Sequence, residues 1–175
     1  EKVMYRMVQG DVGCGKTMVA AFAMYACVLA HKQAALLVPT EILARQHVKN
    51  LQSLFDGFNI EVALLCSSMK QSEKEAILKR LANHEIDIII GTHALFQQQV
   101  QFYDLGLVVA EEQHRFGVEQ RKKMLSKGEK VDLLLMSATP IPRTLAIIIY
   151  GDFVPNISVC TGHFILNREA VTVAY

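Results

Sequence analysis

An eight-residue segment near the start of the chain restricts the fold more than any other feature. Residues 10–17 read Gly-Asp-Val-Gly-Cys-Gly-Lys-Thr and satisfy the pattern G-x-x-x-x-G-K-[ST]. They follow a strand-like run, Tyr5–Gln9, and precede a helix-like run, Lys16–Ala30. Glycines allow the backbone to turn so that successive N–H groups face an anion, and the start of the helix adds a favourable dipole. The segment therefore predicts a phosphate-binding loop between a strand and a helix.

The expected ligand of this loop is a nucleoside triphosphate with Mg²⁺. Lys16 would reach the β- and γ-phosphates, and the Thr17 hydroxyl would ligate the magnesium ion. The alternative is a chance match in a glycine-containing turn, which has odds on the order of 1% in a chain of this length. The residues predicted to bind the nucleotide are Gly10, Asp11, Val12, Gly13, Cys14, Gly15, Lys16 and Thr17.

Short apolar runs alternate with longer amphipathic ones along most of the chain. The strand-like runs are Tyr5–Gln9, Ala34–Val38, Glu61–Leu65, Asp87–Ile90, Leu105–Ala110 and Val131–Met136. Several are nearly continuous in Val, Ile and Leu, as in parallel strands that are covered on both faces. The pattern predicts a doubly wound α/β fold, a mostly parallel sheet with helices on both faces.

Three helices are expected between these strands. Lys16–Ala30 is apolar almost all round, so we expect it to be buried. Glu41–Phe55 has Thr40 as a possible cap and places Leu43, His47, Leu51 and Leu54 on one face. Ser72 and Glu75 fit a capping box ahead of a third helix, which would bury Ile77, Leu78 and Leu81.

Composition excludes several classes of protein. The chain is 51% hydrophobic and 20% charged with a net charge of +1, so it is neither a disordered tail nor a wholly basic nucleic-acid coat. The longest apolar run, Met18–Ala30, is about two thirds of a membrane span, and no membrane role is expected. The four cysteines form no C-x-x-C pair, which favours reduced thiols over a disulfide or zinc framework. No signal peptide is visible, and the chain does not begin with Met, so we expect a fragment of a longer protein.

A phosphate-binding loop of this type needs a carboxylate at the end of a neighbouring strand. The run Leu105–Ala110 leads into Glu111 and Glu112, which meet this requirement. Glu111 is the candidate magnesium ligand and Glu112 the candidate general base. The alternative is a solvated acidic turn after a strand.

Taken together, the motifs resemble those of a known family. The sequence is similar to the first RecA-like motor lobe of superfamily 2 helicases, and within these to the bacterial branch-migrating DNA helicases of the RecG group. The resemblance covers residues 4 to about 152. Besides residues 8–17, the matching segments are PTEILARQH at 39–47, GTHALFQ at 91–97, EQHRFGVEQR at 112–121 and SATPIPRT at 137–144.

The resemblance implies roles for further residues. Pro39, Thr40, Gly91, Thr92 and His93 would contact the DNA backbone, and Thr40 could also act simply as a helix cap. Lys16, Glu111, Glu112 and His114 would be catalytic. His114 with Gln113 would couple the nucleotide site to DNA through Ser137, Ala138 and Thr139. The remaining histidines, at positions 31, 47, 84 and 163, are expected to have surface or packing roles.

The resemblance also implies partners that lie outside this chain. We expect residues 1–152 to form the ATP-binding lobe, and residues 153–175 to form a linker toward a second RecA-like lobe. That second lobe would supply an arginine finger, and a wedge domain would recognise branched or forked DNA. The isolated chain is therefore expected to be a poor ATPase that binds DNA weakly. A bacterial cytoplasmic location follows from the same resemblance.

Two departures and three alternatives stay open at this stage. The family normally has Asp where this chain has Glu111, and the extra methylene would move the carboxylate by about 1.5 Å and slow hydrolysis. Residues 160–167 do not follow the family's usual linker.

The alternatives are the corresponding lobe of a transcription-repair coupling factor, which usually has a second acid where Gln113 stands, and a non-enzymatic or weakened nucleotide-binding module. The third, a small-molecule kinase, is opposed by the lack of a lid segment.

Overall fold

All six strand-like runs form strands, and their bounds lie within one residue of those expected. The computed structural model describes residues 3–111, 118–138, 156–160, 163–167 and 170–174. The strands are β1 (Tyr5–Gly10), β2 (Gln33–Leu37), β3 (Val62–Leu65), β4 (Ile88–Gly91), β5 (Leu105–Glu111), β6 (Asp132–Ser137), β7 (Asn156–Cys160), β8 (His163–Asn167) and β9 (Ala170–Ala174). The helices are α1 (Lys16–Leu29), α2 (Glu41–Leu54), α3 (Gln71–Ala82), the short 3₁₀ helix η1 (His93–Phe96) and α4 (Val118–Leu125).

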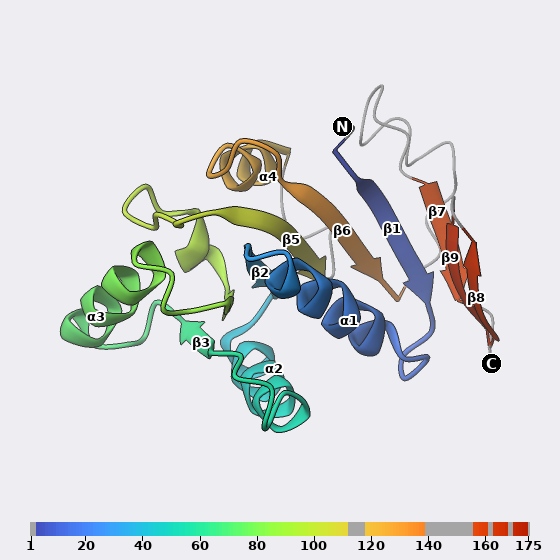
Figure 1. The fold of residues 1–175 in the computed structure, drawn as a ribbon, viewed down its shortest axis with the longest axis horizontal. Helices are drawn as coiled ribbons and strands as arrows, with labels where there is room; N and C mark the ends of the chain where they lie inside the picture. Colours follow the sequence, from blue (N-terminus) through green and yellow to red (C-terminus); the bar gives the residue numbers. More distant parts are fainter. Residues whose placement is uncertain (1–2, 112–117, 139–155, 161–162, 168–169, 175) are drawn as a thin grey trace.

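One parallel sheet organises these elements. Its strand order is β3-β4-β2-β5-β6-β1-β7, and each neighbouring pair in it is parallel. Figure 1 shows the helices lying on either side of the strands. The predicted doubly wound α/β fold is therefore confirmed. β8 and β9 form a separate antiparallel pair.

The two faces of the sheet carry separate hydrophobic cores because successive strand residues point in opposite directions. On one face, Leu36 of β2 and Val109 of β5 pack with residues of α1 and α2, among them Met24 and Leu51. On the other, Leu37 and Val108 pack with residues of η1, α3 and α4. Both faces of the central strands are covered, which explains their continuous apolar sequences.

Helix α1 differs from the expectation that it is buried all round. It buries Val19, Ala20, Ala21 and Met24. The outer face is exposed, with Phe22 61% and Leu29 63% accessible in this chain. The correction has a simple cause: a helix packed on one face of a sheet buries only the stripe that touches it.

The predicted capping box before α3 is wrong. The helix begins at Gln71, so Ser72 already lies inside it, and the residue at the cap position is Lys70, which makes no side-chain cap. Lys74 instead donates from its ammonium group to the carbonyl of Ser67 at 2.6 Å. The burial prediction holds in part: Leu81 is fully buried, whereas Ile77 and Leu78 are half-buried against the same core.

A single buried amide connects three chain segments at the amino ends of the central strands. The Gln33 NH₂ group donates to the carbonyls of Leu81 and Ile86, at 2.9 and 2.7 Å. Its carbonyl accepts from the backbone N–H groups of Tyr103 and Asp104, at 2.8 and 3.2 Å. Gln33 is fully buried with both ends of its side chain hydrogen-bonded, so it fixes the end of α3 and the segment before β5 against β2.

Within the described ranges, none of the helices combines the length and apolar character that crossing a lipid bilayer requires. Cys14, Cys27 and Cys66 are free thiols.

Candidate nucleotide site and the adjoining edge of the sheet

The loop between β1 and α1 has the geometry that its sequence predicts. Gly13 and Gly15 have φ values of +84° and +89°, which side chains disfavour and glycine adopts readily. α1 begins immediately after Gly15, with no side-chain cap and no acidic residue in its first turn. The positive end of the helix dipole is therefore not neutralised locally, as an anion-binding loop requires.

Lys16 is the first residue of α1, and its side chain folds back onto the start of this loop. Its ammonium group donates to the carbonyl oxygens of Gly10 and Asp11, each at 2.6 Å. Its nitrogen also lies 3.8 Å from the Cys14 sulfur. Among the described residues, the contacts of this cation are two backbone carbonyls and the Cys14 sulfur and include no carboxylate, so its charge is available for phosphate oxygens. Thr17 follows on the first turn of α1 and is half-buried. The donor set therefore fits the phosphates of a nucleotide with Mg²⁺ near the Thr17 hydroxyl.

Glu111, the candidate magnesium ligand, ends β5. It is level with Met136 of β6, which is level with Val8 of β1, two residues before the loop begins at Gly10. Glu111 and the loop thus lie at the same edge of the sheet, two strands apart. The Glu111 side chain is 21% exposed, and its Oε2 lies 2.8 Å from Nε2 of His47 on α2.

His47 is the functional candidate that the sequence did not single out. The sequence predicts a surface or packing role for this residue, and it is indeed buried, with its side chain 8% exposed. The available signal was a polar residue on the apolar face of α2, between Leu43 and Leu51. Its contact with Glu111 could not be found from the sequence because the two residues are 64 positions apart.

Glu112, Gln113, His114 and Thr139 lie outside the described residues. Ser137 ends β6 and is buried, and Ala138 follows it. Gln9 of β1 is level with Ser137.

The residues predicted to contact DNA lie at the same edge, beyond β5. Thr40 caps α2, since its Oγ1 accepts from the N–H of Leu43 at 3.3 Å. Pro39 precedes it and is half-buried, and Thr40 itself is exposed. The cap prediction for Thr40 is therefore confirmed, while its contact with DNA stays a prediction.

Gly91 ends β4, Thr92 follows it, and His93 opens η1. Thr92 is half-buried and His93 is exposed. A Cβ on Gly91 would lie 2.4 Å from the Leu65 carbonyl oxygen, so the close approach of β3 and β4 requires glycine here. This packing requirement explains Gly91 without any ligand.

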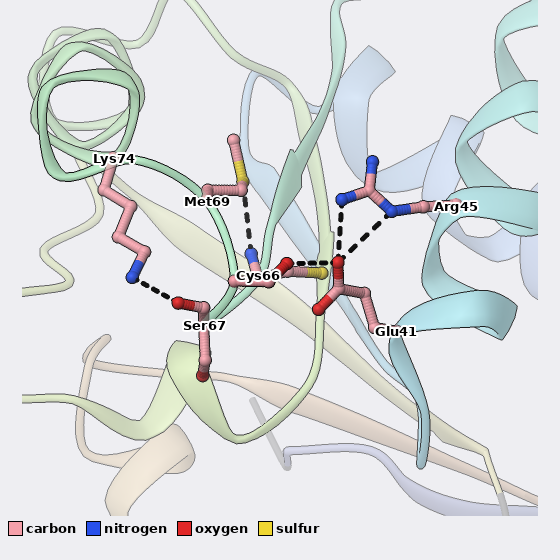
Figure 2. Close-up of polar contacts among 7 residues, drawn as sticks. Glu41, Arg45, Cys66, Ser67, Met69 and Lys74 are labelled. Atoms are coloured by element: carbon pink, nitrogen blue, oxygen red, sulfur yellow. Dashed lines mark hydrogen bonds and ion pairs between the residues drawn. The ribbon is translucent and has the colours of Figure 1, made fainter.

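A cluster of polar contacts joins the start of α2 to the loop after β3 (Figure 2). Glu41 accepts from the Arg45 guanidinium at 2.7 Å and from the Ser68 hydroxyl. These contacts, the hydroxyl first and the guanidinium second, hold the pKa of Glu41 below its usual value. The backbone N–H of Cys66 donates to the Met69 sulfur at 3.4 Å. The loop at residues 66–70 is thereby held beside Thr40.

The strand order divides this edge of the sheet into two adjoining halves. The nucleotide-binding, magnesium and coupling candidates lie at the ends of β1, β5 and β6, and the DNA-binding candidates lie at the ends of β2 and β4. β5 and β2 are neighbours, with Leu37 level with Ala110. The pair formed by His47 and Glu111 crosses the boundary between the halves.

Comparison with known proteins identifies the family. The sequence profile of the DEAD/DEAH box helicases matches residues 2–148. The chain belongs to the DEAD/DEAH box helicase family. Among curated members, the ATP-dependent DNA helicase RecG of Bacillus subtilis is 58% identical over 149 residues, which are 85% of this chain and 22% of that protein. RecG of Thermotoga maritima is 54% identical over 152 residues, or 87% of this chain and 20% of the relative.

A solved helicase structure agrees with the sequence comparison. RecG bound to a three-way DNA junction superposes with a TM-score of 0.77 at 49% identity, covering 91% of this chain and 21% of that one. The expected RecA-like fold and the resemblance to RecG are thus confirmed. The chain spans about a fifth of the length of these RecG relatives.

Proposed function

We propose that this chain is the ATP-binding motor lobe of an ATP-dependent DNA helicase or translocase of the RecG type, acting on replication forks and recombination intermediates in the bacterial cytoplasm. The observation that carries the proposal is the arrangement of one sheet edge. The phosphate-binding loop follows β1, and the Glu111 carboxylate ends β5. Beside them lie the start of α2, after β2, and the segment after β4, both of which are suited to contacts with a DNA backbone. The names of the relatives, ATP-dependent DNA helicases, support the same reading.

The proposed site residues have separate tasks. Lys16 and the backbone of residues 10–17 would bind the phosphates, and Thr17 with Glu111 would hold Mg²⁺. Bound Mg²⁺ and ATP would supply a polarised terminal phosphoryl group. Glu112 would accept a proton from the attacking water. His114, Gln113 and residues 137–139 would couple this chemistry to DNA. Residues 153–175 would lead toward the second lobe, and that lobe and a wedge domain would complete the full-length helicase.

The DNA contacts are proposed to be few and mostly uncharged. Hydroxyl and backbone N–H groups at Thr40 and Thr92 position a backbone without reading base edges. With a net charge of +1, the chain would neutralise few phosphates, so its affinity would be weak and would fall shallowly with salt.

Phosphate release by the full-length protein, with and without forked DNA, tests the proposal. We expect DNA to stimulate hydrolysis, and Glu112→Gln to abolish turnover while retaining ATP. Hydrolysis that does not respond to DNA would favour a nucleotide-binding switch instead. Labelled-fork anisotropy over a salt series provides the second arm, since tight, sequence-selective binding by residues 1–175 alone would contradict the proposal.

A further inference from the structure

The contact between His47 and Glu111 has features that set it apart from an ordinary packing contact. Nε2 of the imidazole and Oε2 of the carboxylate are 2.8 Å apart, and both side chains are largely withdrawn from water, at 8% and 21% exposure. Because a carboxylate can only accept, Nε2 is the donor in this hydrogen bond. Shielded hydrogen bonds to ionised groups are short and directional, so this one restricts how Glu111 can rotate.

The position of the contact gives that restriction a purpose. Glu111 ends β5 on the nucleotide side of the edge, and Oε2 is the oxygen that His47 holds. His47 therefore restrains Oε2 and leaves Oε1 available to other partners. Groups that hydrogen-bond to a metal-ligating side chain in this way orient it and tune its affinity for the metal.

The length of the Glu111 side chain matters as well. An aspartate at this position would carry its carboxylate about 1.5 Å farther back, so with the backbone unmoved it would not keep the 2.8 Å contact with Nε2. Glu111, which is one methylene longer than an aspartate, thus reaches His47 of α2 from the end of β5.

We infer that His47 is a positioning residue for the magnesium site: it holds Oε2 of Glu111 so that the other carboxylate oxygen faces the cation of the bound nucleotide. The inference rests on the proposed function, since it takes Glu111 to be the magnesium ligand. His47 itself touches neither the nucleotide nor the metal in this scheme. It acts through the orientation of Glu111 alone.

The test compares variants that keep or remove the donor at position 47 of the full-length protein. Gln places an N–H donor near the position of Nε2, whereas Leu fills similar volume without a donor. Mn²⁺ serves as the probe for Mg²⁺, with free Mn²⁺ measured by electron paramagnetic resonance in the presence of ATP. A fluorescent ATP analogue reports nucleotide binding in EDTA.

We expect His47→Leu to weaken Mn²⁺ binding by about 10- to 100-fold while leaving metal-free nucleotide binding unchanged. His47→Gln should restore Mn²⁺ binding to within about threefold of the wild type. Wild-type Mn²⁺ affinity in the leucine variant would overturn the inference, and so would equal weakening in both variants, because the donor would then not matter. Thermal unfolding checks that each variant folds.

If the leucine variant does not fold, His47→Asn makes the same comparison, since its amide stops about one bond short of Glu111. Wild-type Mn²⁺ affinity in that variant would equally overturn the inference. Lys16→Ala separates this result from failure of the proposed function. If Lys16→Ala still binds nucleotide normally, the nucleotide site itself is wrong. If it loses nucleotide while the His47 variants bind Mn²⁺ normally, only the role of His47 is wrong.

Discussion

The Lys16 ammonium group lies 2.6 Å from the carbonyl oxygen of Gly10, the first residue of its own loop. Its other contacts are the Asp11 carbonyl oxygen at 2.6 Å and the Cys14 sulfur at 3.8 Å, so the ammonium group lies within the loop that is proposed to bind phosphates. We expect Lys16→Ala to reduce affinity for Mg·ATP by at least about tenfold, because the group supplies a full positive charge to the phosphates.

Isothermal titration calorimetry measures this change. The matched control is Lys79→Ala, the same substitution at an exposed position of α3, which packs against β3 at the edge of the sheet far from β1. It should bind nucleotide as the wild type does. The half-exposed position of Lys16 predicts little change in melting temperature, and equal affinities for Lys16→Ala and the wild type would refute the assignment of the loop.

Gln33→Leu should be strongly destabilising. Removing the amide takes a partner from the buried carbonyl of Ile86 and from the N–H groups of Tyr103 and Asp104, while the Leu81 carbonyl keeps a bond from the N–H of His84. Each buried group left without a partner costs about 1–3 kcal/mol. We expect a loss of about 3–5 kcal/mol in the free energy of unfolding, because part of the loss is relieved by relaxation. Urea denaturation measures it. Gln52→Leu is the control: its amide makes one contact, with the Val62 carbonyl, and should cost about 1 kcal/mol.

Gly91→Ala tests whether this glycine is required by packing. The new methyl group would meet the Leu65 carbonyl at 2.4 Å, and a backbone atom in a parallel sheet cannot move aside cheaply. We expect a loss of about 3 kcal/mol or more in stability. At Gly57 nothing lies within 4 Å and only its φ of +81° opposes a side chain, so Gly57→Ala should cost about 1 kcal/mol. Similar losses in the two variants would show that the Leu65 contact is relieved by local movement.

Cys27 and Cys66 should react slowly with alkylating reagents. Burial raises the pKa of each thiol from 9.0 to about 11, and for Cys27 the carboxylates of Asp132 and Asp104 add to the effect. At pH 8 the thiolate fraction should therefore be about 100-fold lower than in the unfolded chain. Mass spectrometry after timed exposure to iodoacetamide, with and without urea, measures the ratio. Comparable rates in both conditions would contradict the burial of these thiols.

The same thiols predict a pH dependence of stability. Between pH 9 and about 11 the unfolded state loses their protons while the folded state keeps them, so stability falls as pH rises through this window. Below pH 9 their contribution is constant. The variant with both Cys27→Ala and Cys66→Ala should show a smaller fall over this range than the wild type, which isolates the thiols from lysines and tyrosines that titrate nearby.

The sequence by itself determined the elements whose cause is local. The glycine spacing of residues 10–17 implies a turn that only glycine adopts readily, and Gly13 and Gly15 have the positive φ values that such a turn needs. Strand bounds followed from continuous apolar runs, and Thr40 caps α2 through a contact only three residues away. Local reasoning failed at the start of α3. Ser72 and Glu75 match a capping box, yet the helix begins one residue before Ser72.

Only the tertiary structure decided which distant residues meet. Phe22 and Leu29 face away from the sheet because only one stripe of α1 touches it. Sequence periodicity could not show which side of an all-apolar helix would be left exposed. Strand order placed β5 beside β2, and this brought His47 within 2.8 Å of Glu111 across 64 residues of sequence. Hydrogen bonds of this kind arise from the packing of whole elements. The sequence supplies the two residue types, whereas the order of the strands decides that they come into contact.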